Sequence, residues 1–406
     1  MGDKGMVIVG AGEAGVRAAF ALRERGYQGT LTLIGDEPHL PYERPPLSKG
    51  GEEAGTVRAI VANERFAEAG ITFLRGRRAI SLDPARHALL LEAGETLSYE
   101  RLLLATGAAP RQVPGIGTSD RIHVLRTVED ASAIRRHMRG DGRLAILGGG
   151  FIGLELAAMG RKLGTAVTLF EAQPRVLMRG VPEKLALALQ ARHAAEGVEL
   201  LCGVGIETIA DGESGVTVGF ADGRQIKVDA LVVGIGAQPN TRLAAEAGLA
   251  IDNGIAVDRH LATSDPHVFA AGDCCSFPVT AYGGRRVRLE SWRNAQEQGS
   301  VAAANLLGEA ASFDAVPWFW SDQYDLTLQV AGLSDGATST VGRTLSPEAE
   351  ILFHLDADGR LLAASGLGPG GAVARDIRLA EMLIARGTRP DPAALADPSV
   401  KLKSLL

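Results

Sequence analysis

The sequence predicts an α/β protein in which two parallel-sheet domains, one inserted within the other, precede a small α+β C-terminal domain. The first observation is a strand, a glycine-rich turn and a helix that occur twice, beginning near residues 6 and 144. The second is a change of pattern after residue 313, where short alternating apolar runs at 327–330, 351–355 and 361–364 predict strands and the pattern of 375–386 predicts a helix. Because 406 residues exceed what one hydrophobic core usually organises, two or three domains are expected.

The first unit runs from the apolar residues 6–9 into a G-x-G-x-x-G turn made by Gly10, Gly12 and Gly15. The first glycine makes the tight turn, the second lets the backbone approach a pyrophosphate, and the third lets helix and strand pack closely. A second strand follows and ends at Asp36, at the distance of about 20 residues expected for a carboxylate that holds ribose hydroxyls. This register predicts a Rossmann-like dinucleotide site, whereas glycines alone would be weak evidence.

The second unit repeats this pattern after the strand at residues 144–147. Its glycines are Gly148, Gly150 and Gly153. Its acidic residue is Glu171, at the end of the next strand. A carboxylate there repels a 2′-phosphate and accepts a hydrogen bond from a 2′-hydroxyl, so Glu171 favours NADH over NADPH. The nearby Arg175 leaves open that a cation offsets this preference.

Two further segments complete the first site. Residues 101–107 form an apolar strand that ends at Thr106 and Gly107, and residues 268–273 form a strand that ends at Asp273. Asp273 could instead cap a following helix. Because the chain leaves the first domain before the second fingerprint and returns after it, the second dinucleotide-binding domain is inserted in the first. The predicted boundaries are 1–108 and 238–312 for the first domain, 109–237 for the inserted domain and 313–406 for the C-terminal domain.

Composition excludes several classes of function. The net charge of −6 disfavours nucleic acid, which needs a basic face. The longest nearly apolar stretch, 145–160, is too short to span a bilayer, and no secretion signal precedes the first strand, so we expect a cytoplasmic protein without a membrane partner. Cys202, Cys274 and Cys275 form no CxxC pair and no metal-ligand spacing, so no metal and no dithiol relay are expected.

Six segments carry a family resemblance over essentially the whole length. They are GDEPHLPYERPPLSK (35–49), LLLATGAAPR (102–111), LRTVEDA (125–131), GGGFIGLE (148–155), TSDPHVFAAGDC (263–274) and PWFWSDQY (317–324). With these segments the chain resembles the two-dinucleotide-binding flavoprotein reductases of glutathione-reductase-like fold. The first and last segments are specific to the ferredoxin reductases of bacterial oxygenase systems.

The resemblance implies where FAD and NADH are held. FAD is implied along Gly10, Gly12, Ala14, Gly15, Asp36, Arg44, Lys49, Ala79, Thr106, Gly107, Arg126, Asp273 and Trp292. NADH is implied along Gly148, Gly150, Phe151, Ile152, Gly153, Glu171 and Gly236, with Glu155 near the nicotinamide. One departure from the family is Trp292-Arg293, where relatives often have a smaller apolar residue and proline; this puts only the side-chain role of Trp292 in doubt.

Three residues are expected to act in the reaction. A cation at Lys49 would stabilise the anionic reduced flavin, although a solvated lysine at the end of a proline-constrained loop is the plain alternative. Glu155 lies in an apolar stretch where an unpaired carboxylate is costly, which indicates a functional partner. Trp320 resembles the family tryptophan at the flavin and nicotinamide edge, whereas Trp318 is expected to be a core residue at a domain interface.

The implied activity is that of an NADH-dependent ferredoxin reductase of the EC 1.18.1 type, acting in aromatic hydrocarbon catabolism. FAD would pass electrons singly to a [2Fe–2S] ferredoxin that feeds a Rieske dioxygenase, a monooxygenase or a cytochrome P450. We expect a monomer or weak dimer, with Arg65 and Arg293 as candidates for ferredoxin docking. The alternative is a redox-responsive NADH- and FAD-binding protein of the apoptosis-inducing-factor type. Reduction of a disulfide, peroxide or quinone is disfavoured because no active-site cysteine is evident.

Overall fold

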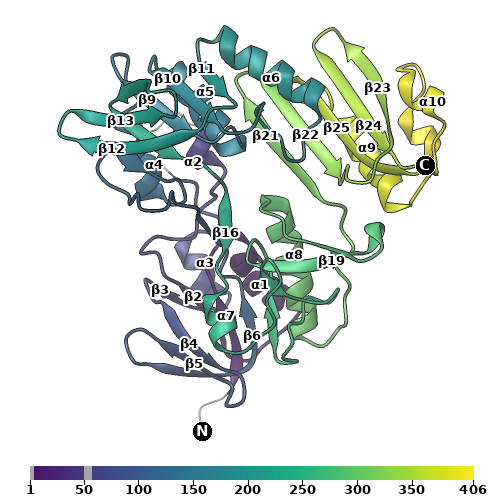
Figure 1. Ribbon diagram of the computed structural model, residues 1–406. Coiled ribbons are helices and arrows are strands. Elements are labelled where there is room, and N and C mark those ends of the chain that lie inside the picture. Colours follow the sequence, from purple (N-terminus) through teal and green to yellow (C-terminus); the bar gives the residue numbers. More distant parts are fainter. Residues whose placement is uncertain (1–3, 50–56) are drawn as a thin grey trace. The chain divides into compact units, whose positions relative to one another are not determined.

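The computed structural model describes residues 4–49 and 57–406, which divide into two compact units (Figure 1). Unit 1 takes in the described parts of Met1–Glu43, Val57–Ala109 and Gln238–Pro317. Unit 2 takes in the described parts of Arg44–Thr56, Pro110–Ala237 and Trp318–Leu406. Each unit therefore contains one of the two glycine fingerprints, and unit 2 also contains the C-terminal residues. The chain passes between the units at β7 (Ala108–Pro110) and β16 (Ala237–Pro239), among other places.

Unit 1 is built on one seven-stranded sheet. Its strands are β3 (Thr72–Arg75), β2 (Leu31–Gly35), β1 (Gly5–Val9), β6 (Thr96–Leu104), β5 (Ala88–Leu91) and β4 (Ala79–Asp83) in order, with β18 (Val268–Ala270) also pairing with β6. The pairings among β1, β2, β3, β6 and β18 are parallel, whereas β4 and β5 form an antiparallel hairpin beside β6. Every residue of β1 is buried, as the continuous apolar run predicts for a strand covered on both faces.

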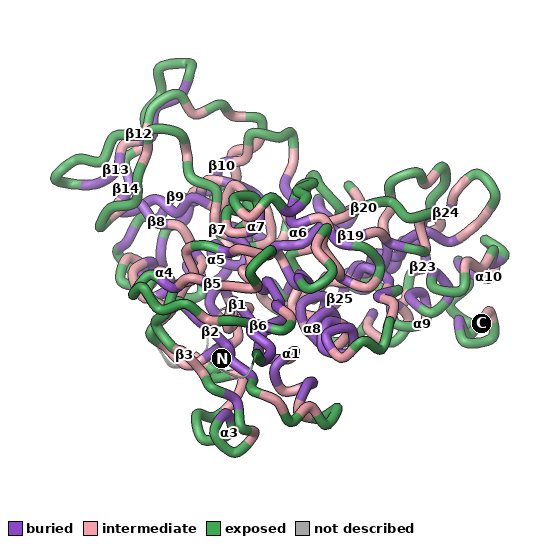
Figure 2. Tube along the Cα trace, turned by 90° about the horizontal axis from the view of Figure 1, so that it is seen from below, coloured by how far each residue is buried: buried purple, intermediate pink, exposed green. Residues whose placement is uncertain are grey.

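Helices α1 (Glu13–Glu24) and α8 (Trp292–Leu306) pack against each other in unit 1, and Figure 2 shows much of both traces as buried. A Cβ at Gly299 would lie 2.5 Å from the Ala14 carbonyl oxygen, so the two helices approach too closely for any other residue there. The remaining elements of unit 1 are α3 (Asn63–Glu68), α7 (Arg242–Glu246), η1 (Thr280–Tyr282) and a small sheet of β17 (Ile255–Ala256), β19 (Cys275–Val279) and β20 (Arg285–Val287).

Unit 2 contains a second parallel sheet. Its strands are β11 (Glu199–Cys202), β10 (Ala166–Glu171), β9 (Arg143–Leu147), β15 (Ala230–Val233) and β8 (Ile122–His123) in order. Its helices are α2 (Pro46–Lys49), α4 (Val128–Arg135), α5 (Phe151–Lys162) and α6 (Glu183–Ala195). An antiparallel meander of β12 (Ile206–Gly212), β13 (Gly215–Phe220) and β14 (Gln225–Val228) accompanies the sheet. The predicted α/β class with two dinucleotide-type sheets is confirmed.

The C-terminal part of unit 2 is a five-stranded antiparallel sheet with helices. The sheet order is β21 (Trp318–Gln323), β22 (Leu326–Gly332), β25 (Leu361–Pro369), β24 (Ala349–Leu355) and β23 (Ser339–Ser346). It is followed by α9 (Ala374–Ala385), α10 (Pro392–Ala396) and η2 (Leu402–Leu405). Three of these strands and α9 were expected from the alternating and helical patterns, whereas β21 and β23 were not. Among residues 4–49 and 57–406, the structure contains no helix with the length and apolar character needed to cross a bilayer.

The C-terminal segment is held by a buried arginine on β23. Arg343 is 3% exposed, and its Nε lies 3.3 Å from Oδ2 of Asp376 on α9. Its two terminal nitrogens donate to four backbone carbonyls. Those carbonyls belong to Leu395, Asp397, Pro398 and Val400. One guanidinium therefore fastens the last residues of the chain to the sheet.

We expect Arg343→Met to release this segment. The substitution leaves the Asp376 carboxylate and the carbonyls without their cation, which for a buried ion pair costs about 3 to 5 kcal/mol of stability. Protease cleavage after residue 390 should accelerate, and thermal unfolding should begin at a lower temperature. Arg378→Met is the matched control, because its ion pair with Glu381 is formed by a largely exposed arginine side chain. Equal protease resistance of the two variants would contradict the proposed role of Arg343 in holding the C-terminal segment.

Candidate functional site

The two glycine turns have the same geometry. Gly10 has φ +110°, and a Cβ there would lie 2.1 Å from the Ala105 carbonyl oxygen. Gly148 has φ +112°, and a Cβ there would lie 2.4 Å from the Gly234 carbonyl oxygen. The first glycine of each fingerprint is thus required both by its left-handed backbone and by the neighbouring strand.

The third glycine of each turn is also explained by packing inside the protein. A Cβ at Gly15 would lie 1.8 Å from the Gly10 carbonyl oxygen, and one at Gly153 would lie 2.1 Å from that of Gly148. In both cases the added atom would separate the helix from the turn that precedes it.

At the second glycines, Gly12 and Gly150, nothing within the protein itself requires a residue without a side chain. Their φ values, −79° and −81°, suit any residue, and a Cβ at either position would meet no described atom within 4 Å. Each is the N-cap of a twelve-residue helix, α1 or α5, and neither helix has a side-chain cap. Open space in front of a helix N-terminus fits a diphosphate, which the helix amides and dipole attract. The residues therefore fit a dinucleotide at both turns.

The two predicted ribose carboxylates differ in their surroundings. Asp36 follows β2, is exposed, and has Oδ2 3.5 Å from Nη2 of Arg78. Glu171 ends β10, where Oε2 accepts from the Gly149 amide at 2.7 Å and Oε1 accepts from the Gln173 amide at 2.7 Å. These two hydrogen bonds therefore hold the Glu171 carboxylate in position beside the second glycine turn.

Arg175, whose position in the sequence left open an offsetting cation, is bonded within its own loop. Its guanidinium donates to the carbonyl oxygens of Val176, Leu177 and Val181, at 3.0 to 3.1 Å. These bonds tie the arginine to its own loop. Glu171 is consequently expected to act without compensation from Arg175.

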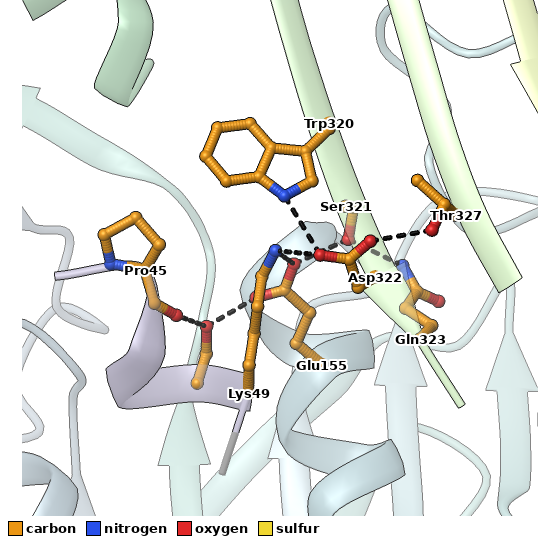
Figure 3. Close-up of polar contacts among 9 residues, drawn as sticks. Pro45, Lys49, Glu155, Trp320, Ser321, Asp322, Gln323 and Thr327 are labelled. Atoms are coloured by element: carbon orange, nitrogen blue, oxygen red, sulfur yellow. Dashed lines mark hydrogen bonds and ion pairs between the residues drawn. The ribbon is translucent and has the colours of Figure 1, made fainter. Parts of the chain in front are cut away.

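The three predicted catalytic residues meet in unit 2, as Figure 3 shows. Lys49 is the last residue of α2, and its Nζ lies 3.9 Å from Oε1 of Glu155 on α5 and 4.7 Å from the centre of the Trp320 ring on β21. The nearest carboxylate to Lys49 is that of Asp322, with Oδ2 2.9 Å from Nζ. Lys49 is therefore paired with two carboxylates and lies over an indole ring, and is not a plainly solvated lysine.

Asp322 binds the polar groups on the exposed side of the cluster formed by Lys49, Glu155 and Trp320. It accepts hydrogen bonds from Lys49, from the Trp320 indole N–H at 3.0 Å, and from the Thr327 hydroxyl at 2.8 Å (Figure 3). Burial by itself would raise the pKa of Asp322, but the hydrogen bonds from Lys49 and Thr327 outweigh it, so the pKa is lowered. Asp322 thus remains a carboxylate and holds both Lys49 and Trp320.

Glu155 occupies the buried side. Its side chain is 7% exposed, and it accepts from the Ser48 hydroxyl at 2.5 Å and from the Ser321 hydroxyl at 2.6 Å. Burial raises the pKa of Glu155, and the charge of Lys49 and the two serine hydroxyls offset this rise only in part. The site therefore contains a buried acid that is easier to protonate than an exposed glutamate.

The other predicted cofactor residues of unit 1 lie near its glycine turn or in its strands. Thr106 donates from its hydroxyl to the Asn240 carbonyl, and the Asn240 amide donates back to the Thr106 carbonyl. Asp273 precedes strand β19, so the alternative in which it caps a helix is wrong. Trp292 begins α8, and a hydrogen bond from its side chain helps to counter the pKa rise that burial causes at Glu13. Gly107 has φ +68°, Ala79 begins β4, and Ala14 lies in the first turn of α1.

The remaining predicted residues belong to unit 2. Arg44 donates to the Arg126 carbonyl at 2.6 Å, which joins the loop before α2 to the loop before α4. Phe151 begins α5 and packs edge-on against Phe319, while Ile152 is 45% exposed beside the second glycine turn. Gly236 has φ +103°. Trp318, expected to be a core residue at a domain interface, is half-buried and stacks on Trp320 with ring centres 5.4 Å apart.

Cys202, Cys274 and Cys275 are free thiols in this structure. Cys274 and Cys275 are fully buried, and their Sγ atoms donate to the Leu104 and Ala271 carbonyls and to Oε1 of Gln298, respectively. Burial raises the pKa of both thiols, and it also raises that of Cys202. A thiolate nucleophile is therefore disfavoured at all three positions.

Sequence reasoning missed the residues that surround Glu155 and Lys49. Ser48, Ser321 and Asp322 lie within quoted motifs, but no role was assigned to them. Ser321 and Gln323 are buried polar residues two apart on β21, and alternation along PWFWSDQY would have placed them on one face. Their partners, Glu155 on α5 for Ser321 and His193 on α6 for Gln323, are far away in the sequence.

Comparison with known proteins identifies relatives along the whole chain. Residues 4–299 match the family model described as pyridine nucleotide-disulphide oxidoreductase, and residues 318–406 match the one described as reductase C-terminal. The ferredoxin–NAD(+) reductase component of the anthranilate 1,2-dioxygenase system of Burkholderia cepacia is 41% identical, with 98% of each chain covered. Putidaredoxin reductase of Pseudomonas putida is 37% identical, over 99% of this chain and 96% of that protein.

Structural comparison agrees with these relatives. The reductase in the crystal structure of the covalent putidaredoxin reductase–putidaredoxin complex superposes with a TM-score of 0.92 and 36% identity. The superposition covers 100% of this chain and 98% of that one.

Proposed function

Since the chain belongs to the pyridine nucleotide-disulphide oxidoreductase family, we propose that it is a flavoprotein that passes electrons from NADH through FAD to a [2Fe–2S] ferredoxin. The observation that carries this proposal is the pair of glycines, Gly12 and Gly150, which leave open space before two uncapped helices. Two dinucleotides are thereby accounted for in one chain, and the named relatives work with ferredoxins.

The proposed residue roles form two sets, one for each dinucleotide. The FAD residues are Gly10, Gly12, Ala14, Gly15, Asp36, Arg44, Lys49, Ala79, Thr106, Gly107, Arg126, Asp273 and Trp292. The NADH residues are Gly148, Gly150, Phe151, Ile152, Gly153, Glu171 and Gly236. We assign 1–108 and 238–312 to an FAD domain, 109–237 to an NAD domain and 313–406 to a C-terminal domain.

When bound, FAD supplies the step from two-electron to one-electron transfer, because a flavin accepts a hydride and can release electrons singly. The protein's own part is electrostatic. Lys49 provides a fixed positive charge, Asp322 orients that charge and the Trp320 ring, and Glu155 provides a buried carboxyl group beside Lys49. This arrangement needs no nucleophile, in keeping with the buried thiols.

The ferredoxin in turn would serve a terminal oxygenase, either a Rieske dioxygenase or monooxygenase or a cytochrome P450. We place the protein in the cytoplasm, where a reducing environment suits its three free cysteines. Arg65 and Arg293 remain candidates for docking; each also forms an ion pair on its own helix, with Glu68 and Glu297.

Replacing Cys202, Cys274 and Cys275 together by serine should leave more than about half of the NADH-driven ferredoxin reduction. Serine hydroxyls can donate to the same acceptors as the buried thiols, so the fold is expected to survive. The measurement is ferredoxin or cytochrome c reduction by the purified yellow protein, with one FAD per chain confirmed from the absorption spectrum. A folded, FAD-bound triple variant that has lost ferredoxin reduction would overturn the cysteine-independent route.

The same assay separates this enzyme from a binding protein of the apoptosis-inducing-factor type. Such a protein would form a slow charge-transfer complex with NADH in place of rapid turnover. A long-lived complex without ferredoxin reduction would favour the binding protein.

A further inference from the structure

A buried line of hydrogen bonds runs from Glu155 away from Lys49. The Ser321 hydroxyl donates to Oε1 of Glu155, and Nε2 of Gln323 donates to that hydroxyl at 3.1 Å (Figure 3). On the far side, Oε1 of Gln323 lies 2.8 Å from Nε2 of His193 on α6. The line ends at Tyr324, whose hydroxyl lies 3.3 Å from Nδ1 of His193.

Water does not compete for the middle of this line. Ser321 and Gln323 are each 1% exposed, and His193 is 0% exposed. Each polar atom in the line must therefore be satisfied by its protein neighbours. The direction of each hydrogen bond is therefore fixed by which atoms can donate a proton and which can only accept one.

The direction follows from the groups involved. The Gln323 oxygen can only accept, so Nε2 of His193 carries the proton, and Nδ1 of the neutral ring accepts from Tyr324. Burial lowers the pKa of His193, and the hydrogen bond to Gln323 opposes this only in part, which agrees with a neutral ring. All four bonds thus donate toward Glu155, and such chains strengthen one another.

His193 decides which way the Gln323 amide faces. If its N–H were absent, nothing on α6 would hold the amide oxygen, and the amide could turn that oxygen toward Ser321. The Ser321 hydroxyl would then donate to Gln323 and no longer to Glu155. Glu155 would lose one of its two hydroxyl donors, and the donor from Ser48 would remain.

We propose that His193 and Gln323 are positioning residues that keep Glu155 ionised beside Lys49 through the orientation of Ser321. The role in NADH-dependent flavin reduction rests on the function proposed above. The arrangement itself depends only on side chains of unit 2.

Several charged groups surround this line of hydrogen bonds, and their influence on the titration of Glu155 must be the same in every variant. Lys49 and Asp322 face Glu155. The groups around His193 and Tyr324 are Arg192 on α6, Glu196 directly after α6, Arg161 and Lys162 on α5, and Asp325 after β21. None of these is altered in the variants below.

The direct test is the titration of the Glu155 carboxyl carbon by NMR in the purified, FAD-bound protein before NADH is added. Glu155→Gln assigns the signal by its loss. His193→Phe should raise the titration midpoint by about one pH unit, because losing a hydrogen bond to a charged group costs roughly that much. His193→Gln, whose amide can donate in place of Nε2–H, should restore the midpoint. If phenylalanine is not accommodated, His193→Met also lacks a donor and adapts its shape.

Two controls separate this role from general disturbance of the core. His354→Phe makes the same replacement of a buried histidine on β24, which bonds Thr340, and should leave the midpoint unchanged. Ser321→Ala removes the donor itself, so adding His193→Phe to it should produce no further shift. A folded His193→Phe protein with an unshifted midpoint, or an additive shift in the double variant, would overturn the proposal.

The kinetic test uses rapid mixing of each variant with NADH over a range of pH. The rate of flavin reduction should fall at low pH, along the acid limb of its pH profile. The pH at which it falls should rise with the NMR midpoint in His193→Phe and stay unchanged in His354→Phe. If the unmodified protein is not reduced by NADH, the proposed function fails, while the NMR result still decides the positioning roles. An NMR shift without a shift of the acid limb would show that Glu155 ionisation does not control the reaction, and would overturn the proposed kinetic role.

Discussion

Valine in place of Gly12 is expected to give a colourless protein, whereas valine in place of Gly150 should give a yellow protein that NADH no longer reduces. Both positions have an ordinary backbone and open space around an added Cβ, so the fold should accept the side chain. The isopropyl group would occupy the space proposed for a diphosphate and keep it from the helix amides. Because each lost charge-assisted hydrogen bond is worth about 1.5 to 3 kcal/mol, affinity should fall by more than about a hundredfold.

The measurements are FAD content by absorption and NADH-driven bleaching of the flavin. Gly117→Val and Gly205→Val are matched controls, since an added Cβ at either glycine also meets no described atom within 4 Å. Both controls should be yellow and fully reducible. A Gly12→Val protein that retains FAD, or a Gly150→Val protein that NADH bleaches at the normal rate, would contradict the assignment of the two turns.

Glu171→Arg is expected to narrow or invert a preference for NADH over NADPH that we place at about tenfold or more in kcat/KM. Tenfold corresponds to about 1.4 kcal/mol, which the repulsion between a held carboxylate and a 2′-phosphate should exceed. The Gly149 and Gln173 amides hold Glu171 in position, and Arg175 is engaged by three carbonyls of its own loop. The local structure therefore favours the charge of Glu171 as the deciding factor.

Two variants separate that charge from other effects. Glu171→Gln keeps an oxygen that can accept from the Gly149 amide but removes the charge, so it should lose most of the discrimination while keeping the loop. Glu199→Arg makes the same charge reversal on the neighbouring strand β11 and should leave the preference unchanged. Equal use of both coenzymes by the unmodified protein would show that another cation offsets Glu171.

The two glycine turns, the parallel sheets they serve and the carboxylates that follow the next strands can all be predicted from the sequence alone. These features are local: a turn that needs φ near +110°, a strand on one side and a helix on the other are all encoded within about 30 residues. The same locality made the C-terminal strands β22, β24 and β25 and helix α9 predictable from their periodicity. It left two roles open for Asp273, because a carboxylate after a strand looks the same in the sequence whether a helix or the strand β19 follows.

The surroundings of Glu155 are set by the packing of the folded chain. Ser48, Ser321, Gln323 and His193 lie on three elements, α2, β21 and α6, which come together with α5 only through packing, so the sequence does not reveal the bonds they form. The same holds for Asp322, which takes the closest position to Lys49. A buried polar atom must find a partner wherever the fold provides one, and that choice is made by the folded chain as a whole.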